Sequence, residues 1–215
     1  TNNISLFVKK PVNITRGFFG TDKIIFINKK FSISFWLYLY KKGDELSNIF
    51  YYGNNENEKY IALWLEPYQP RFRLSISTVS NSSEQIQIDS EIQMYSWSHI
   101  NISCDRNNLK LSVNNKSILS KSLSSQFMIP NNKKIYISSP WHKSTNAYIS
   151  NFKYYPGHIL NKNNVNLLQN FTTNLEPIFK FNSTIQLSNN QILSNKFKFK
   201  YPAYTYIFWI YPFTQ

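Results

Sequence analysis

Hydrophobic and polar residues alternate with a period of two along most of this chain. Residues 97–118 show it most clearly, because apolar side chains occupy every second position in 100–104 and again in 109–113. Successive side chains of a β-strand point to opposite faces of its sheet, so the pattern buries one face of each strand. The polar break at 105–108 and the asparagine pair at 114–115, which tolerates the positive φ of tight turns, end the two runs. The stretch therefore predicts three consecutive antiparallel strands.

The same alternation predicts further strands. Residues 31–40 carry apolar side chains on one face and aromatic ones, including Trp36 and Tyr38, on the other, which predicts a central strand covered on both sides. Closely spaced strands with turn residues between them and almost no helical periodicity are typical of a sandwich or barrel. The other predicted strands are 23–27, 49–52, 60–65, 72–78, 85–88, 134–138 and 147–155, and one weak helical turn is predicted at 164–169.

An aromatic segment near the C-terminus repeats the pattern of the strand around Trp36. Residues 204–211 match it when Trp209 is aligned with Trp36, and the spacing is about that of one large β-sandwich domain. We therefore predict one domain at 1–170. For 171–215 we expect either the opening strands of a second, truncated domain or an extension that adds strands to the first.

The composition agrees with a packed β core and restricts the partners. Aromatic residues make up 17% of the chain and charged residues 16%, which excludes a disordered chain. The net charge of +13 is carried mostly by scattered lysines, and without an arginine-rich stripe or a nucleic-acid-binding motif we expect no nucleic-acid partner. The longest apolar run, residues 204–213, is about half a membrane helix, so no membrane span is expected in this segment.

Cys104 is the only cysteine, so no disulfide can form within the chain. It continues the alternation of residues 100–104, which predicts a small buried side chain rather than a nucleophile. Secreted β domains of this size often carry a disulfide, so its absence favours assembly in a reducing compartment.

These elements together resemble the laminin G-like, concanavalin A-like jelly-roll family. The segments 31–36, 97–100, 109–116 and 147–155 follow one another in the family's order. The likeness extends over about residues 1–170, the first predicted domain. It implies an all-β fold of two antiparallel sheets packed face to face as a jelly-roll sandwich, one of them concave. The closing strand is most similar to versions in large DNA virus particles and protist surface proteins, so the surface of a cell or virus particle is the favoured location.

The chain lacks the patterns that catalysis or metal binding on this fold would need. The family's retaining glycosidases carry three spaced carboxylates on one strand. The nearest pair here, Asp89 and Glu91, shares a face but lacks the third carboxylate and is expected to begin a loop. None of the three histidines has metal-ligand spacing, and His99 is expected to be a partly exposed sheet residue. Asp44 and Asp105 could offer oxygens to calcium, but their loops follow ordinary turn chemistry. We therefore predict no catalytic, metal-binding or cofactor-binding residue.

Two segments, residues 64–73 and 140–145, carry the kinds of side chain that bind sugars. Sugars stack on exposed tryptophan or tyrosine rings that are flanked by amide and charged hydrogen-bonding groups. An exposed Trp141 would suit this role, whereas a buried one would be a core or interface residue under the closing strand, which we favour. The candidate glycan or partner contacts are Trp64, Tyr68, Arg71, Arg73, Trp141 and His142.

The function predicted from the sequence is a non-enzymatic structural or interaction module of a larger, tandem-domain protein. It would pack with other protein chains in a shell, fibre or surface coat, as a minor structural protein of a large virus particle or a protist surface protein. The alternative is a glycan-binding adhesion module, and the third function is glycoside hydrolysis. Should the chain pass through a secretory route, Asn81 in its Asn-Ser-Ser sequence is the expected glycosylation acceptor.

Overall fold

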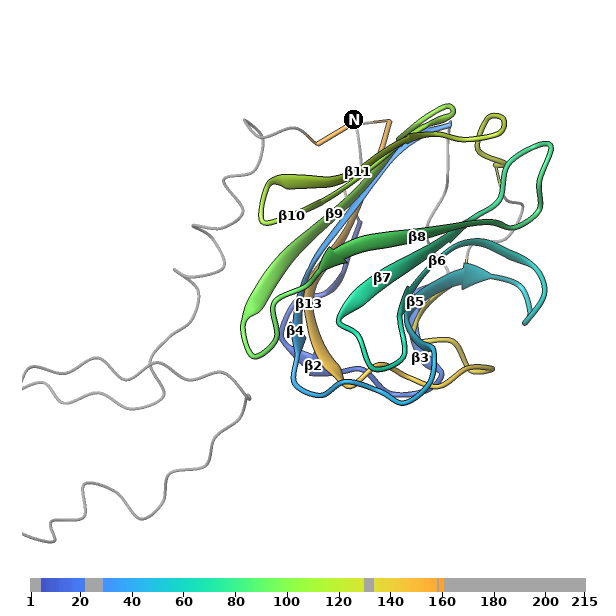
Figure 1. Cartoon of the computed structure of the whole chain (residues 1–215). Helices are drawn as coiled ribbons and strands as arrows, with labels where there is room; N and C mark the ends of the chain where they lie inside the picture. The colour runs from blue at the N-terminus through green and yellow to red at the C-terminus, as the bar shows by residue number, and fades with distance from the viewer. Residues whose placement is uncertain (1–4, 22–28, 130–133, 158, 161–215) are drawn as a thin grey trace, which may run out of the picture.

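The computed structural model describes residues 5–21, 29–129, 134–157 and 159–160 (Figure 1). Within them the regular elements are thirteen β-strands. The predicted strand at 23–27, the predicted helical turn at 164–169, and the segment 171–215 with its repeat at Trp209 lie outside the described residues.

The strands form two antiparallel sheets. The seven-stranded sheet has the order β1-β13-β4-β9-β10-β11, with β2 paired to β13, and the six-stranded sheet has the order β3-β12-β5-β6-β7-β8 (Figure 1). This arrangement confirms the predicted jelly-roll sandwich. The bounds in the first sheet are β1 Ser5–Val8, β2 Val12–Asn13, β4 Lys30–Leu39, β9 Trp97–Asp105, β10 Asn108–Val113, β11 Lys116–Ser122 and β13 Ala147–Pro156. Those in the second are β3 Phe18–Thr21, β5 Ser47–Gly53, β6 Lys59–Leu65, β7 Arg71–Ile76, β8 Glu84–Glu91 and β12 Ile135–Ile137.

The core lies between the two sheets and consists of the side chains that the alternation placed on one face. Phe35 on β4 stacks on Phe152 of β13, with ring centroids 5.3 Å apart and planes at 11°. Phe50 on β5 reaches both rings from the opposite sheet at 5.9 and 5.6 Å. Cys104 is fully buried as predicted, and burial raises the pKa of its thiol to about 12. The core therefore joins the two sheets through aromatic contacts.

The three strands predicted from residues 97–118 are β9, β10 and β11. Leu109 pairs with Cys104 and Leu111 with Ile102, so the apolar positions of both strands share the inner face. Asn114 and Asn115 adopt φ of 48° and 65° at the second turn, which is the conformation that asparagine tolerates better than other non-glycine residues.

His99 differs from its expectation, because it is buried with 2% of its surface exposed. It lies opposite Trp36 on the outer face of β4 and β9, and the two ring centroids are 5.2 Å apart. Strands β4 and β9 are both interior strands of their sheet, so neighbouring side chains cover the imidazole. Burial first, and then the charge of Lys153, lower the pKa of His99 from its ordinary 6.5 to about 4.

We expect His99 to make the protein less stable in mild acid, by about 2 kcal/mol at pH 5. The pKa is lower in the folded state than in the unfolded chain, where it is near 6.5. The unfolded chain therefore binds the proton more tightly, and stability present above pH 6.5 is lost as the pH falls toward 4. Urea unfolding at pH 7, 6 and 5 measures this effect. The variant His99→Phe keeps a ring beside Trp36. Between pH 7 and pH 5 it should lose about 2 kcal/mol less stability than the unaltered protein does. Equal losses in both proteins would contradict the prediction.

Candidate functional site

An aromatic cluster lies on the outer face of the six-stranded sheet, away from the main core. Tyr51 on β5 and Trp64 on β6 point outward, because their neighbours along each strand belong to the core between the sheets. Tyr136 lies opposite Tyr51 on β12, and Trp141 and His142 follow in the loop after β12. These five side chains are termed the outer-face cluster.

Tyr51 is the centre of the outer-face cluster. Its ring centroid lies 6.3 Å from that of Trp64, 5.7 Å from that of Trp141 and 5.9 Å from that of His142. His142 also meets Trp64 edge to face at 4.7 Å, and Trp141 meets Tyr136 at 5.8 Å. Tilted and edge-to-face pairs at these separations are favourable. The five rings therefore support one another.

The outer-face cluster has a buried base and a partly exposed rim. Tyr51 is fully buried and Trp64 is only 4% exposed, whereas Tyr136, Trp141 and His142 are half-buried. The Trp64 indole donates a hydrogen bond to the Ser75 hydroxyl, 3.1 Å away. The rim rings are thus the aromatic surfaces that a ligand could contact.

Gly53 is required where the chain turns beside Tyr51. A Cβ at this position would lie 2.6 Å from Cε1 of Tyr51 and 2.9 Å from Cα of Lys59, and it would also clash with the Glu58 carbonyl oxygen. In the same turn, the Tyr51 hydroxyl donates to the Asn55 carbonyl oxygen, 2.7 Å away. Burial raises the pKa of Tyr51 well above its ordinary value, so the hydroxyl keeps its proton.

Asn48 on β5 anchors the loop that carries Trp141 and His142. Its side chain is fully buried, and its Nδ2 donates to the carbonyl oxygens of Phe50 (3.0 Å) and Leu63 (3.2 Å). Its Oδ1 accepts from the Ser139 amide at 2.8 Å. Every one of these partners is a backbone group. Asn48 therefore joins two strands and the loop at one point.

Ser139 connects Asn48 to the rim residues Trp141 and His142. Its hydroxyl oxygen accepts from the Trp141 amide at 3.1 Å and forms a hydrogen bond with Nδ1 of His142 at 2.9 Å. Burial is the main cause that lowers the pKa of His142, and the charge of Glu56 opposes it. His142 is consequently neutral at physiological pH, and tilted and edge-to-face ring contacts together with a hydrogen bond hold its ring.

Charged and amide groups continue the outer face beside the cluster. Arg73 lies directly opposite Trp64 in the β6–β7 pairing, and Gln87 lies opposite Arg73 on β8. The Arg73 guanidinium forms two hydrogen bonds with the Glu66 carboxylate, at 2.8 and 3.0 Å. Such a bidentate pair fixes both planar groups. Gln87 is exposed, so this edge of the cluster offers polar groups to solvent.

The structure brings together three of the six candidate residues. Trp64, Trp141 and His142 share the outer-face cluster, and Arg73 adjoins it. Arg71 lies further along β7 and pairs with Glu91 at 3.3 Å. Tyr68 lies in the β6–β7 loop with 68% of its surface exposed. Trp141 is half-buried and packs against Tyr51 and Tyr136, so its role as a glycan contact or as a core or interface residue stays a prediction.

Sequence reasoning missed the centre of the cluster. Tyr51 and Tyr136 both occupy outward positions between apolar neighbours, and this alternation is the signal that could have identified them. Asn81 is exposed in the loop after β7, as expected. Asp89 and Glu91 lie within β8 instead of at the start of a loop.

The acids considered for calcium have lysine partners. Asp44 pairs with Lys143 at 2.7 Å, and Asp105 lies 3.7 Å from Lys30. Across the described residues, no group of three or more histidine, cysteine or acidic side chains could hold a metal ion. The described part of the chain also contains no helix long and apolar enough to cross a membrane.

Comparison with known proteins identifies the family. The profile of a laminin G family, described as the concanavalin A-like lectin/glucanases superfamily, matches residues 19–166. The chain belongs to this superfamily. The match includes every residue of the outer-face cluster. A comparison with curated protein sequences gives no significant match.

Several solved structures share the fold. The binding domain of botulinum neurotoxin serotype D has a TM-score of 0.58 at 14% identity, and the match covers 80% of this chain and 47% of that one. The binding domain of Paraclostridial Mosquitocidal Protein 1 has a TM-score of 0.56 at 19% identity, with 80% and 48% covered. Botulinum neurotoxin type C, which depends on interaction with two ganglioside molecules to enter cells, gives 0.50 at 18%, with 67% and 36% covered. The chain thus spans less than half the length of these structures.

Proposed function

We propose that this chain is a non-enzymatic binding module that holds a carbohydrate on the outer-face cluster. One observation carries the proposal: the half-exposed ring of Trp141 packs against the buried ring of Tyr51 and meets the half-exposed ring of Tyr136. The apolar face of a sugar stacks on such rings, and its hydroxyl groups bond to polar side chains beside them. Arg73 and Gln87 supply those polar groups.

The rigidity of the rim supports this role. Ring contacts and the hydrogen bonds that Trp141 and His142 form with the Ser139 hydroxyl group hold both residues before any ligand arrives. Binding to a preorganised surface avoids the loss of side-chain entropy that would otherwise weaken it. A flexible loop tryptophan would lack this advantage.

The state of Glu66 supports binding rather than hydrolysis. A glycosidase needs one carboxyl group that gives a proton and a second carboxylate that acts as nucleophile or base. Both oxygens of Glu66 accept hydrogen bonds from Arg73, so the guanidinium engages the whole carboxylate. Glu66 is also only 6% exposed, so its carboxylate is poorly placed to reach a bound sugar.

The similar solved structures also support a binding role. Two of those described are binding domains, and gangliosides, with which botulinum neurotoxin type C interacts, are lipids that carry a carbohydrate. Packing with other protein chains in a shell, fibre or surface coat stays a prediction. Glycan binding and self-association, measured for the unaltered protein and for Trp141→Ala, distinguish the two functions.

We expect Trp141→Ala to weaken carbohydrate binding about 30-fold or more, because removing a central aromatic contact commonly costs at least ~2 kcal/mol. A glycan array identifies the ligand for the unaltered protein, and calorimetry then gives the dissociation constants. Trp97→Ala removes another half-buried tryptophan, which lies on the seven-stranded sheet beside Tyr38, and should leave the affinity unchanged. Thermal melting establishes that both variants fold.

Two outcomes would overturn the proposal. One is an array on which the unaltered protein binds no glycan, and the other is an equal affinity of Trp141→Ala and the unaltered protein. Self-association that Trp141→Ala abolishes, in the absence of any glycan binding, would support packing between protein chains instead.

A further inference from the structure

Two tyrosines project from one end of the sandwich. Tyr68 in the β6–β7 loop and Tyr95 in the β8–β9 loop have 68% and 69% of their surfaces exposed. Both adopt a φ of 58°, which is an unfavourable conformation for a bulky side chain. Strained positions that persist in a fold often serve a function. The shared conformation and exposure point to a common role.

Backbone hydrogen bonds join the loops at this end. The Tyr68 amide donates to the Gly43 carbonyl oxygen and the Tyr95 amide to the Leu39 carbonyl oxygen, each at 2.8 Å. The Ile92 amide donates to the Pro70 carbonyl oxygen at 2.6 Å and links the two tyrosine loops directly. The backbones of both tyrosines are therefore tied to residues 39–43, at the end of β4 and in the β4–β5 loop, which spans residues 40–46.

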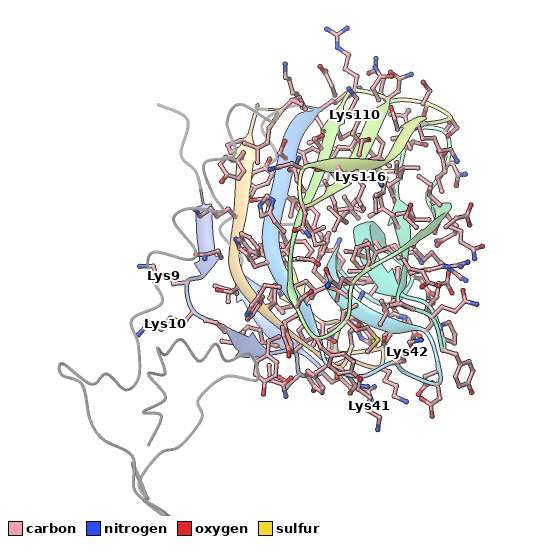
Figure 2. The ribbon with its side chains drawn as sticks, turned by 60° about the vertical axis from the view of Figure 1, so that its left-hand side comes forward. Lys9, Lys10, Lys41, Lys42, Lys110 and Lys116 are labelled. Atoms are coloured by element: carbon pink, nitrogen blue, oxygen red, sulfur yellow. The ribbon has the colours of Figure 1, made fainter. Side chains whose placement is uncertain are left out.

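The β4–β5 loop adds positive charge next to the two tyrosine loops. Lys41 and Lys42 are exposed, and Figure 2 shows them together at one end of the molecule. The two acids of the loop, Asp44 and Glu45, both pair with Lys143 at 2.7 Å. Within the described residues neither Lys41 nor Lys42 forms an ion pair, although Lys41 adds to the field at Asp44.

We propose that Tyr68, Tyr95, Lys41 and Lys42, termed the tyrosine tip, dock the protein on an anionic lipid surface. Tyrosine is enriched where membranes meet water, because its ring is apolar and its hydroxyl is polar. Lysines beside such rings are attracted to anionic head groups. The tip combines both signals at an end of the sandwich, whereas the outer-face cluster lies on a sheet face. A lipid surface and a carbohydrate would therefore use different residues.

Vesicle co-sedimentation tests the tip. The protein should bind vesicles of phosphatidylserine and phosphatidylcholine more tightly than vesicles of phosphatidylcholine alone. Lys41→Gln with Lys42→Gln should lower the partition constant about 30-fold at low salt, from the attraction of two lysines to anionic lipid. Tyr68→Asn with Tyr95→Asn should also lower it, and asparagine tolerates the positive φ of both positions.

A matched double variant separates docking from general charge attraction. Lys110 and Lys116 are also exposed, and Figure 2 shows them toward the other end of the molecule. Lys110→Gln with Lys116→Gln changes the net charge equally and should reduce binding less than threefold. An equal loss in both lysine variants, or no preference of the unaltered protein for phosphatidylserine, would overturn the proposal.

The test is independent of the carbohydrate proposal. The vesicles contain no glycolipid, so carbohydrate recognition cannot contribute to the result. Trp141→Ala should bind phosphatidylserine vesicles as the unaltered protein does. A loss of vesicle binding in that variant would place the lipid contact on the outer-face cluster and contradict the tyrosine tip.

Discussion

Phe35→Ala is expected to lower the free energy of unfolding by about 4 kcal/mol, within the range for phenylalanine truncation in a packed core. Phe35 is fully buried. Its ring stacks on Phe152 in its own sheet and meets Phe50 of the opposite sheet edge-on. The truncation therefore removes a contact within one sheet and a contact between the two sheets, and it leaves a cavity.

Urea unfolding with Phe35→Leu as the control measures this effect. Leucine keeps most of the buried volume and should cost about 1.5 kcal/mol or less. A loss below about 1 kcal/mol for Phe35→Ala would show that the ring is not enclosed between two sheets.

Asn48→Ala is expected to cost about 3 kcal/mol of stability and to release the loop that carries Trp141. The substitution removes three hydrogen bonds and leaves the Ser139 amide and the carbonyl oxygens of Phe50 and Leu63 without this partner. Buried polar groups that lose their partners account for most of such a cost. The structure of the site therefore depends on an amide that touches no ligand.

Two measurements test the role of Asn48. Hydrogen exchange should accelerate at the amides of Ser139 and Trp141, because their hydrogen bonds depend on the anchored loop. Asn57→Ala removes an exposed asparagine of the β5–β6 loop and should change stability by less than about 0.5 kcal/mol. Unchanged exchange at Ser139 in Asn48→Ala would show that the ring contacts hold the loop without Asn48.

The strands were predictable because their signal is local. The period-two alternation predicted a strand at 31–40, and β4 spans Lys30–Leu39. Strand β8 was predicted too short, at 85–88, because it is the edge strand of its sheet. Edge strands carry polar residues at positions that an interior strand would bury, so Asp89 and Glu91 resembled the start of a loop.

The candidate site was only partly predictable, because its geometry depends on contacts between distant segments. Asn48, just before the predicted strand at 49–52, positions a loop 91 residues away. Trp64 was a candidate glycan or partner contact, but it is buried and His142 covers it edge to face. His99 was expected to be partly exposed, and its burial likewise arises from neighbouring strands. Alternation assigns a residue to a face of a sheet, but it does not show what else covers that face.

The most direct test of carbohydrate binding by the outer-face cluster is a titration followed by the indole N–H signals of the five tryptophans in a ¹⁵N–¹H spectrum. The glycan selected by the array should shift the Trp141 signal progressively to saturation. Trp36 and Trp97 lie on the outer face of the other sheet, and their signals should stay in place. A spectrum in which Trp141 does not move while the glycan binds, or in which Trp36 or Trp97 moves instead, would contradict the proposed site.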